Sequence, residues 1–158
     1  MSEEAVEQAV EHLFSELFAA AGEGRRWGDQ LTARDGQTQA RWQLMWTAAA
    51  GSWTVPQIAR RLGVSRQNIQ RLTNELISEG LVNLDQNPDH KSSPIVRLNS
   101  AGQEVLNRIN TSAAASNRQI HTSLGAQRIN ELRTALRDLA DLIKQLEQAA
   151  ATTAPPKK

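Results

Sequence analysis

The sequence predicts a mainly α-helical chain with one small β-hairpin, and three observations support this fold class. Residues 54–80 form two short amphipathic segments joined by a glycine, and two short apolar runs on either side of a polar loop follow them. Near the end of the chain, apolar residues recur at heptad spacing. The length of 158 residues is that of one compact domain of ordinary size.

The N-terminal segment predicts an amphipathic helix whose apolar stripe includes Leu13 and Leu17. Residues 1–24 carry six acids and no base, whereas residues 25–97 carry ten bases and six acids. The net charge is only +1, so the distribution of charge is more informative than its total. An acidic start before a basic region favours a polyanionic partner for the basic region.

Residues 54–80 predict two helices that cross at a tight turn. Thr54 begins a capping-box pattern, and Ser65 suits the N-terminus of the second helix. Ala59 is small where the helices would cross, and Gly63 tolerates the positive φ of the turn. Aliphatic side chains would fill the space between the helices, namely Ile58, Leu62, Val64, Ile69 and Leu72. This spacing is typical of a helix-turn-helix, and the alternative is an ordinary helical hairpin in a core.

The second of these helices predicts a face that reads DNA. At 100° per residue, Ile69, Leu72 and Leu76 share one inward face, and polar side chains lie opposite them. Gln and Asn can pair with an adenine edge and Arg with a guanine edge, and no acid occurs on the outer face before Glu75. The predicted DNA contacts here are Thr54, Ser65, Arg66, Gln67, Asn68, Gln70, Arg71 and Asn74. A merely solvated helix face is the alternative.

A β-hairpin follows directly, with predicted strands at 81–84 and 95–98 and a polar loop at 85–94. A hairpin in this place is a wing, whose basic tip can enter a minor groove or rest on phosphates. The predicted contacts are His90, Lys91, Ser92 and Arg97. Taken alone, the loop is equally consistent with a plain surface hairpin.

From about Leu31 to Asn110 the chain resembles the MarR family of winged helix-turn-helix transcriptional regulators. The resemblance rests on the helix-turn-helix, on Glu79-Gly80-Leu81-Val82, and on Asp89-His90-Lys91 in the wing. The family usually has arginine at the position of Lys91, and lysine keeps the charge but lacks the flat bidentate fork. The resemblance implies a dimeric protein that binds a near-palindromic operator in double-stranded DNA and leaves it when a small molecule binds.

Both ends of the chain predict dimerisation helices. The C-terminal seam steps by three and four residues, as in a coiled coil, and with the N-terminal stripe it supplies the predicted contacts Leu13, Leu17, Ile129, Leu132, Leu136, Leu139, Ile143 and Leu146. The alternative is that the seam packs only within its own chain. We expect an N-terminal helix and connection at 1–35, the winged helix-turn-helix at 36–100, dimerisation helices at 101–150 and a disordered tail at 151–158.

The four tryptophans all lie between residues 27 and 53. In the resembled family, effectors bind where the DNA-binding region meets the dimerisation helices, and this segment belongs at that junction. Arginines nearby could hold a carboxylate, so we expect a small aromatic or phenolic acid. The predicted ligand contacts are Trp27, Arg41, Trp42, Trp46 and Trp53. Ordinary packing of the tryptophans is the alternative.

Other chemistry has little support in the sequence. The chain has no cysteine, which excludes thiol-based redox sensing, and its three histidines are far apart, so no metal site is expected. No catalytic arrangement and no phosphate-binding glycine loop occur, so we expect neither an enzyme nor a cofactor. The sequence contains neither a signal peptide nor an apolar run that would span a membrane, and we therefore expect a cytoplasmic protein.

The sequence thus predicts a dimeric, sequence-specific DNA-binding transcription regulator, a repressor released by a small aromatic effector. One alternative is a winged-helix module that binds a protein, which the low net charge and Lys91 would favour. Another is a regulator with no small-molecule effector.

Overall fold

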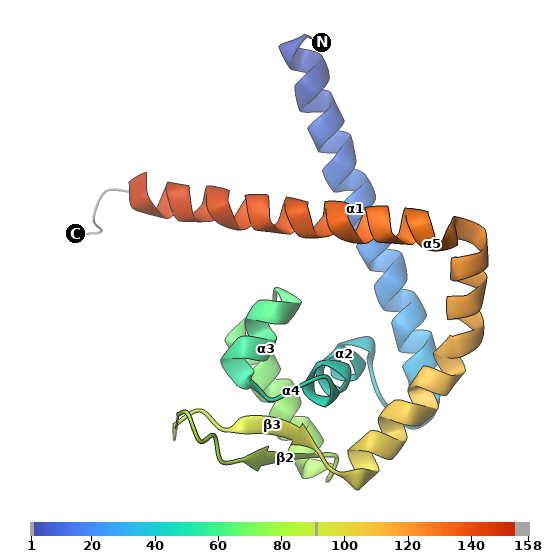
Figure 1. Ribbon diagram of the computed structural model, residues 1–158, viewed down its shortest axis with the longest axis vertical. Coiled ribbons are helices and arrows are strands. Elements are labelled where there is room, and N and C mark those ends of the chain that lie inside the picture. Colours follow the sequence, from blue (N-terminus) through green and yellow to red (C-terminus); the bar gives the residue numbers. More distant parts are fainter. Residues whose placement is uncertain (1, 91, 154–158) are drawn as a thin grey trace. The chain divides into compact units, whose positions relative to one another are not determined.

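The computed structural model describes residues 2–90 and 92–153 (Figure 1). Its elements are α1 (Glu3–Thr32), the 3-10 helix η1 (Ala33–Asp35), α2 (Gln39–Ala49), β1 (Trp53–Thr54), α3 (Val55–Leu62), α4 (Arg66–Ser78), β2 (Val82–Asp85), β3 (Ile95–Leu98) and α5 (Ser100–Thr153). The predicted mainly α-helical fold with a small β-hairpin is confirmed. The chain forms two compact units, residues 1–113 and 114–158.

The core of the first unit lies between α2, α3, α4 and the small sheet. Leu44, Ile58, Ile69 and Leu76 are fully buried there. The first part of α5 packs against the same core, because Val105, Leu106 and Ile109 are buried within it. Burial of these apolar side chains is the main source of stability for the helix-turn-helix.

The helix-turn-helix has the predicted local structure. Gln57 accepts a hydrogen bond from the backbone N–H of Thr54 at 2.8 Å, and Ser65 Oγ accepts one from the N–H of Asn68 at 3.1 Å. Gly63 ends α3 with φ of +66°. The prediction that Val64 fills the space between the helices is wrong, because it is 41% exposed. It lies in the turn before α4 begins, so the inward face of α4 does not include it.

The sheet has three antiparallel strands in the order β1-β3-β2. Trp53 pairs with Val96, and Val82 pairs with Leu98. The sequence did not predict β1, because two residues are too few to show alternation. Strand β2 also begins and ends one residue later than predicted, whereas β3 has the predicted bounds. The hairpin of β2 and β3 extends beyond the helices as a wing (Figure 1).

Helix α5 continues into the second unit, where Gly125 interrupts it with φ of 75° and ψ of 155°. Two separate helices were predicted for this region, and this glycine marks the break between them. Residues 151–153 are helical rather than disordered as predicted, because the alanines before them favour helix. The rest of the predicted disordered tail, 154–158, lies outside the described residues.

No helix within residues 2–90 and 92–153 is long and apolar enough to cross a membrane.

Candidate nucleic-acid interface

Helix α4 presents one polar face to solvent. Ile69, Leu72 and Leu76 are buried on its inner face, as predicted. The predicted reading residues of the helix are exposed or partly exposed, namely Arg66, Gln67, Asn68, Gln70, Arg71 and Asn74, and the capping Ser65 is exposed beside them. The outer face therefore combines amides and guanidinium groups, which are the side chains that pair with base edges in the major groove.

Hydrogen bonds along the helix hold several of these side chains in place. Gln70 Nε2 donates to Asn74 Oδ1 at 3.0 Å, and Arg71 Nη2 donates to Asn68 Oδ1 at 3.0 Å. Arg71 also forms an ion pair with Glu75 one turn later. Such an exposed pair contributes little to stability, so Arg71 can leave Glu75 for a base or a phosphate at small cost.

Thr54 does not belong to this face. It is only 6% exposed, and its hydroxyl donates to Gln57 Oε1 at 3.0 Å. The prediction that its side chain contacts DNA is therefore wrong. Thr54 is the N-cap residue that precedes α3, and its side chain is buried at that end of the helix.

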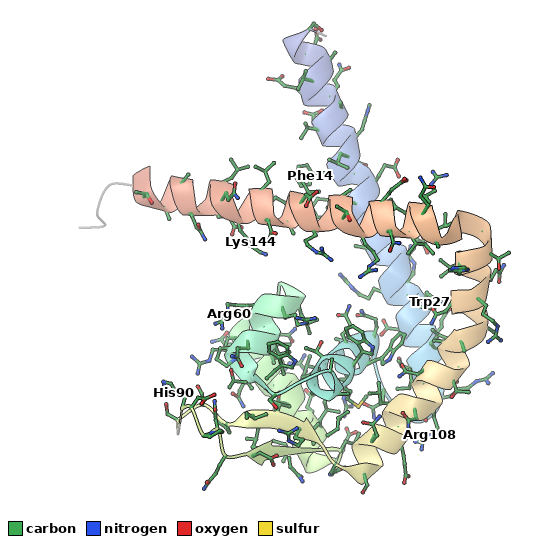
Figure 2. The ribbon with its side chains drawn as sticks, viewed as in Figure 1. Phe14, Trp27, Arg60, His90, Arg108 and Lys144 are labelled. Carbon is green, nitrogen blue, oxygen red and sulfur yellow. The ribbon has the colours of Figure 1, made fainter. Side chains whose placement is uncertain are left out.

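The loop of the wing places His90 at an exposed tip (Figure 2). Asn87 shapes this loop, because its side chain donates to Ser93 O at 2.9 Å and accepts from the N–H of Asp89 at 3.0 Å. Ser92 Oγ lies 3.1 Å from His90 Nδ1. Lys91, which was predicted to contact DNA, lies outside the described residues.

Arg97 is held at the base of the wing. Its Nε donates to Asp85 Oδ2 across the hairpin at 2.6 Å, and its Nη2 donates to Ser52 Oγ at 3.3 Å. The side chain is exposed, but it is already hydrogen-bonded to Asp85 and Ser52. A phosphate would have to share it with Asp85 or displace that carboxylate.

The structure adds two cations that sequence reasoning missed. Arg60 and Arg61 lie in the last turn of α3, and both are exposed. Figure 2 labels Arg60 on this helix. The guanidinium carbon of Arg61 lies 5.2 Å from the ring centroid of Trp53, a cation–π arrangement that limits its motion. Two adjacent arginines in a helix that has no acidic residue were the signal that could have identified them.

A cavity of about 630 Å³ lies beside the helix-turn-helix. Three predicted ligand residues are brought together in its wall, namely Trp27, Trp42 and Trp46. The rings of Trp27 and Trp42 are 6.1 Å apart at 56°. The polar lining includes Arg25, Gln39 and Gln43, and Leu62 and Val64 contribute from the turn between α3 and α4.

Two predicted ligand residues lie elsewhere, so their prediction is wrong for this cavity. Trp53 packs against the core and beneath Arg61. Arg41 is 8% exposed and forms an ion pair with Glu79, with 2.5 Å between Nη2 and Oε2. The Arg41 guanidinium beside Glu79 holds the pKa of that carboxyl below its ordinary value of 4.5, although partial burial opposes this shift. Arg41 and Trp42 are adjacent on α2, and helical geometry turns neighbours to different sides.

The predicted dimerisation residues keep apolar surface accessible in the single chain. Leu13, Leu132, Leu136 and Leu146 are exposed. The others are partly exposed, namely Leu17, Ile129, Leu139 and Ile143. Apolar rows of this kind are typical of surfaces that a partner covers.

The sequence of the chain matches known proteins. The family profile described as MarR family matches residues 37–91, which run from just before α2 into the wing. Uncharacterized proteins of Mycobacterium tuberculosis and Mycobacterium bovis are 39% identical over 135 residues, which cover 85% of this chain and 94% of each relative.

Several solved structures share the fold. A MarR/EmrR family transcriptional regulator from Acinetobacter sp. ADP1 matches with a TM-score of 0.76 and 16% identity, covering 85% of this chain and 96% of that one. A MarR variant from E. coli complexed with operator DNA matches with a TM-score of 0.71 and 17% identity, covering 83% and 95%. CouR from Rhodococcus jostii RHA1, bound to p-coumaroyl-CoA, matches with a TM-score of 0.72 and 16% identity, covering 78% and 88%.

Proposed function

Because the chain belongs to the MarR family of transcriptional regulators, we propose that it is a homodimeric, sequence-specific DNA-binding protein that acts as a repressor and is released by a small aromatic acid. The observation that carries this proposal is the exposed amide and guanidinium face of α4, above all Gln67, Gln70 and Arg71. This face has the donors and acceptors for bidentate pairing with adenine and guanine.

Contacts to the DNA backbone would position that face. Two groups of side chains outside the reading face suit phosphate contacts. They are the exposed Arg60 and Arg61 at the end of α3 and His90 at the tip of the wing. The complex of the E. coli MarR variant with operator DNA supports this proposal, because that protein has the same fold. Since phosphate contacts release counterions, binding should weaken steeply as salt rises.

A homodimer would bring two copies of α4 to one operator. The accessible leucines of α1 and of the seam in α5 supply an apolar surface for the partner. A symmetric dimer suits a near-palindromic site, because each copy reads one half-site and the two half-sites multiply specificity.

An effector would enter the cavity lined by tryptophans. Its volume lies within the range of about 300–1,000 Å³ that is common for small-molecule sites. Trp42 and Trp46 offer flat apolar walls, and Arg25 offers a cation for a carboxylate. Leu62 and Val64 also line the cavity, so a ligand there would touch the turn that orients α4. The p-coumaroyl-CoA bound to CouR supports an aromatic acyl effector, since CouR shares the fold.

Binding to DNA from upstream of its own gene, compared with a random duplex of equal length, tests the proposal. We expect a clear preference for the specific fragment at physiological salt, and a fall in both affinities as salt rises. Arg71→Ala should reduce this preference, and Arg133→Ala is its matched control, because it also removes one exposed cation, here on α5. Equal affinity for both duplexes would contradict sequence-specific reading. If a gel shift showed no retarded DNA band at any protein concentration, the result would favour the alternative of a protein-binding module.

A further inference from the structure

The start of α2 and the end of α4 are joined by a buried cation. The Arg41 side chain has about a tenth of its surface exposed, and it meets Glu79, which caps the C-terminus of α4. Gln37 adds a second tie, because its Nε2 donates to Glu79 Oε2 at 3.3 Å. Three side chains thus connect the recognition helix to the segment where α2 begins.

Both charges lie at helix ends that disfavour them. Thr38 caps α2, so Arg41 lies in its first turn, where the helix dipole is positive. Glu79 lies at the end of α4, where the dipole is negative. Neither helix gains from its own charged residue, and each charge is compensated by the other across the interface. Such an arrangement points to a role in joining the two helices.

Among the described residues, Arg41 forms an ion pair with Glu79 alone. Within the same part of the chain, Nε and Nη2 of Arg41 and Oε1 of Gln37 are buried without a hydrogen-bond partner, so Nη2 meets Glu79 as an ion pair. If Glu79 were lost, the guanidinium of Arg41 would remain buried with its charge uncompensated, which is costly. The interface would then open or shift to admit water to Arg41.

We propose that Arg41 is a positioning residue for DNA binding, which fixes the angle of α4 by holding Glu79. Helix α4 has 13 residues and is about 20 Å long at the usual helical rise. Arg41 holds one end of it, Gln67 lies near the other end, and Arg71 lies near the middle. A small tilt about the held end would therefore move the reading side chains beyond hydrogen-bond range of base edges, where donor–acceptor distances vary by only a few tenths of an ångström.

This inference rests on the proposed DNA-binding function, so its test needs one readout with DNA and one without. The variants are Arg41→Met, Arg41→Lys and Glu79→Gln in the full chain. The control is Lys144→Met, which removes a cation from the exposed pair with Asp141 in the second unit. Affinity for the upstream fragment is measured at a temperature where circular dichroism shows each variant folded, and hydrogen exchange of residues 75–80 and 55–62 is followed by mass spectrometry.

We expect Arg41→Met to lose at least tenfold in DNA affinity and to speed exchange at 75–80 by a similar factor, while 55–62 stays unchanged. Arg41→Lys should restore part of the DNA affinity and part of the slow exchange, because lysine keeps the positive charge but lacks the planar guanidinium group. Glu79→Gln should act in the same direction, and Lys144→Met should change neither readout.

Wild-type affinity in a folded Arg41→Met protein would overturn the proposal. Equal acceleration of hydrogen exchange in both segments would also overturn it, because that result indicates general destabilisation. Should Arg41→Met not fold, the lysine and glutamine variants give the same two readouts. A wild-type protein that binds no DNA would refute the proposed function, while the exchange data would still show whether the joint holds α4.

Discussion

The indole N–H of Trp42 donates a hydrogen bond to the side-chain oxygen of Asn110 at 3.1 Å. Trp42 belongs to α2 and lines the cavity, whereas Asn110 belongs to the first part of α5. The same indole packs against Trp27 of α1. One side chain therefore connects three helices of the first unit at the wall of the proposed effector site.

Replacing Asn110 with leucine should destabilise the first unit by about 1 kcal/mol, the net contribution of a typical hydrogen bond. The indole N–H would lose its acceptor, and tryptophan emission should shift as its surroundings change. Chemical denaturation with emission as the probe gives both values. Asn107→Leu is the matched control, because Asn107 lies one turn earlier on α5 and its side chain accepts a hydrogen bond from Gln103 of the same helix. Equal losses in the two variants would contradict a specific role for the Trp42 bond.

Replacing Arg71 with alanine should weaken specific DNA binding by about 1–3 kcal/mol if Arg71 reads a base. The difference in affinity between wild type and Arg71→Ala should be smaller on DNA in which the contacted base pair is changed, because the wild-type protein has then already lost its contact with that base. Binding to a panel of single-base variants of the upstream fragment measures both effects. A uniform loss across the panel would show instead that Arg71 contacts only phosphate.

An aromatic carboxylic acid should quench tryptophan emission more strongly than its amide, because only the acid pairs with Arg25. Arg25→Met should weaken binding of the acid by about 1.5–3 kcal/mol, the usual range for a hydrogen bond to a charged group, and leave the amide unaffected. Fluorescence titration with both compounds measures this difference. Identical titrations of acid and amide with the wild-type protein would remove Arg25 from the proposed site.

Gly63→Ala should destabilise the protein by about 1–2 kcal/mol, because φ of +66° is strained for a residue with a Cβ atom. A clash is not the cause, since nothing lies within 4 Å of the added Cβ. Gly22→Ala provides the contrast within α1, where alanine should stabilise by about 0.5–1 kcal/mol. Thermal unfolding of both variants checks the two signs. A neutral Gly63→Ala would show that the turn adjusts its backbone.

Stability should fall in acid partly through Glu79. Its pKa is lowered from 4.5 in the folded state by the Arg41 guanidinium beside it. The folded protein therefore holds the ionised carboxylate more strongly than the unfolded chain does. The resulting stability is fully present above pH 4.5 and is lost as the pH falls through the lowered pKa. Glu79→Gln should flatten this part of the profile of unfolding free energy against pH. An unchanged profile would show that Arg41 does not stabilise the carboxylate.

Local patterns accounted for the helix-turn-helix. Ser65 caps α4 and Gly63 ends α3 as predicted, because caps and left-handed glycines act within a single helical turn. The wing followed from two runs of β-formers around a polar loop. Strand β1 could not be predicted, since it exists only because β3 provides a partner for Trp53 and Thr54.

In the candidate site too, local sequence predicted some features, whereas others depend on distant residues. The outward face of α4 was predictable, because the periodicity of a single helix assigns it. The partners of Arg41 and Trp53 were not, since each choice depends on a residue far along the chain. A composition rich in tryptophan and arginine near residue 41 indicated a ligand site without showing which of those side chains would line it.

By itself, the sequence determined the positions of α3 and α4, the turn at Gly63 and the polar face of α4, because each depends on residues within a few positions of one another. Only the tertiary structure decided that Thr54 is buried, that Arg41 is held by Glu79, and that three tryptophans line one cavity. Those features arise where distant segments pack together, and the energy of a buried charge or a stacked ring depends on neighbours that no short stretch of sequence contains.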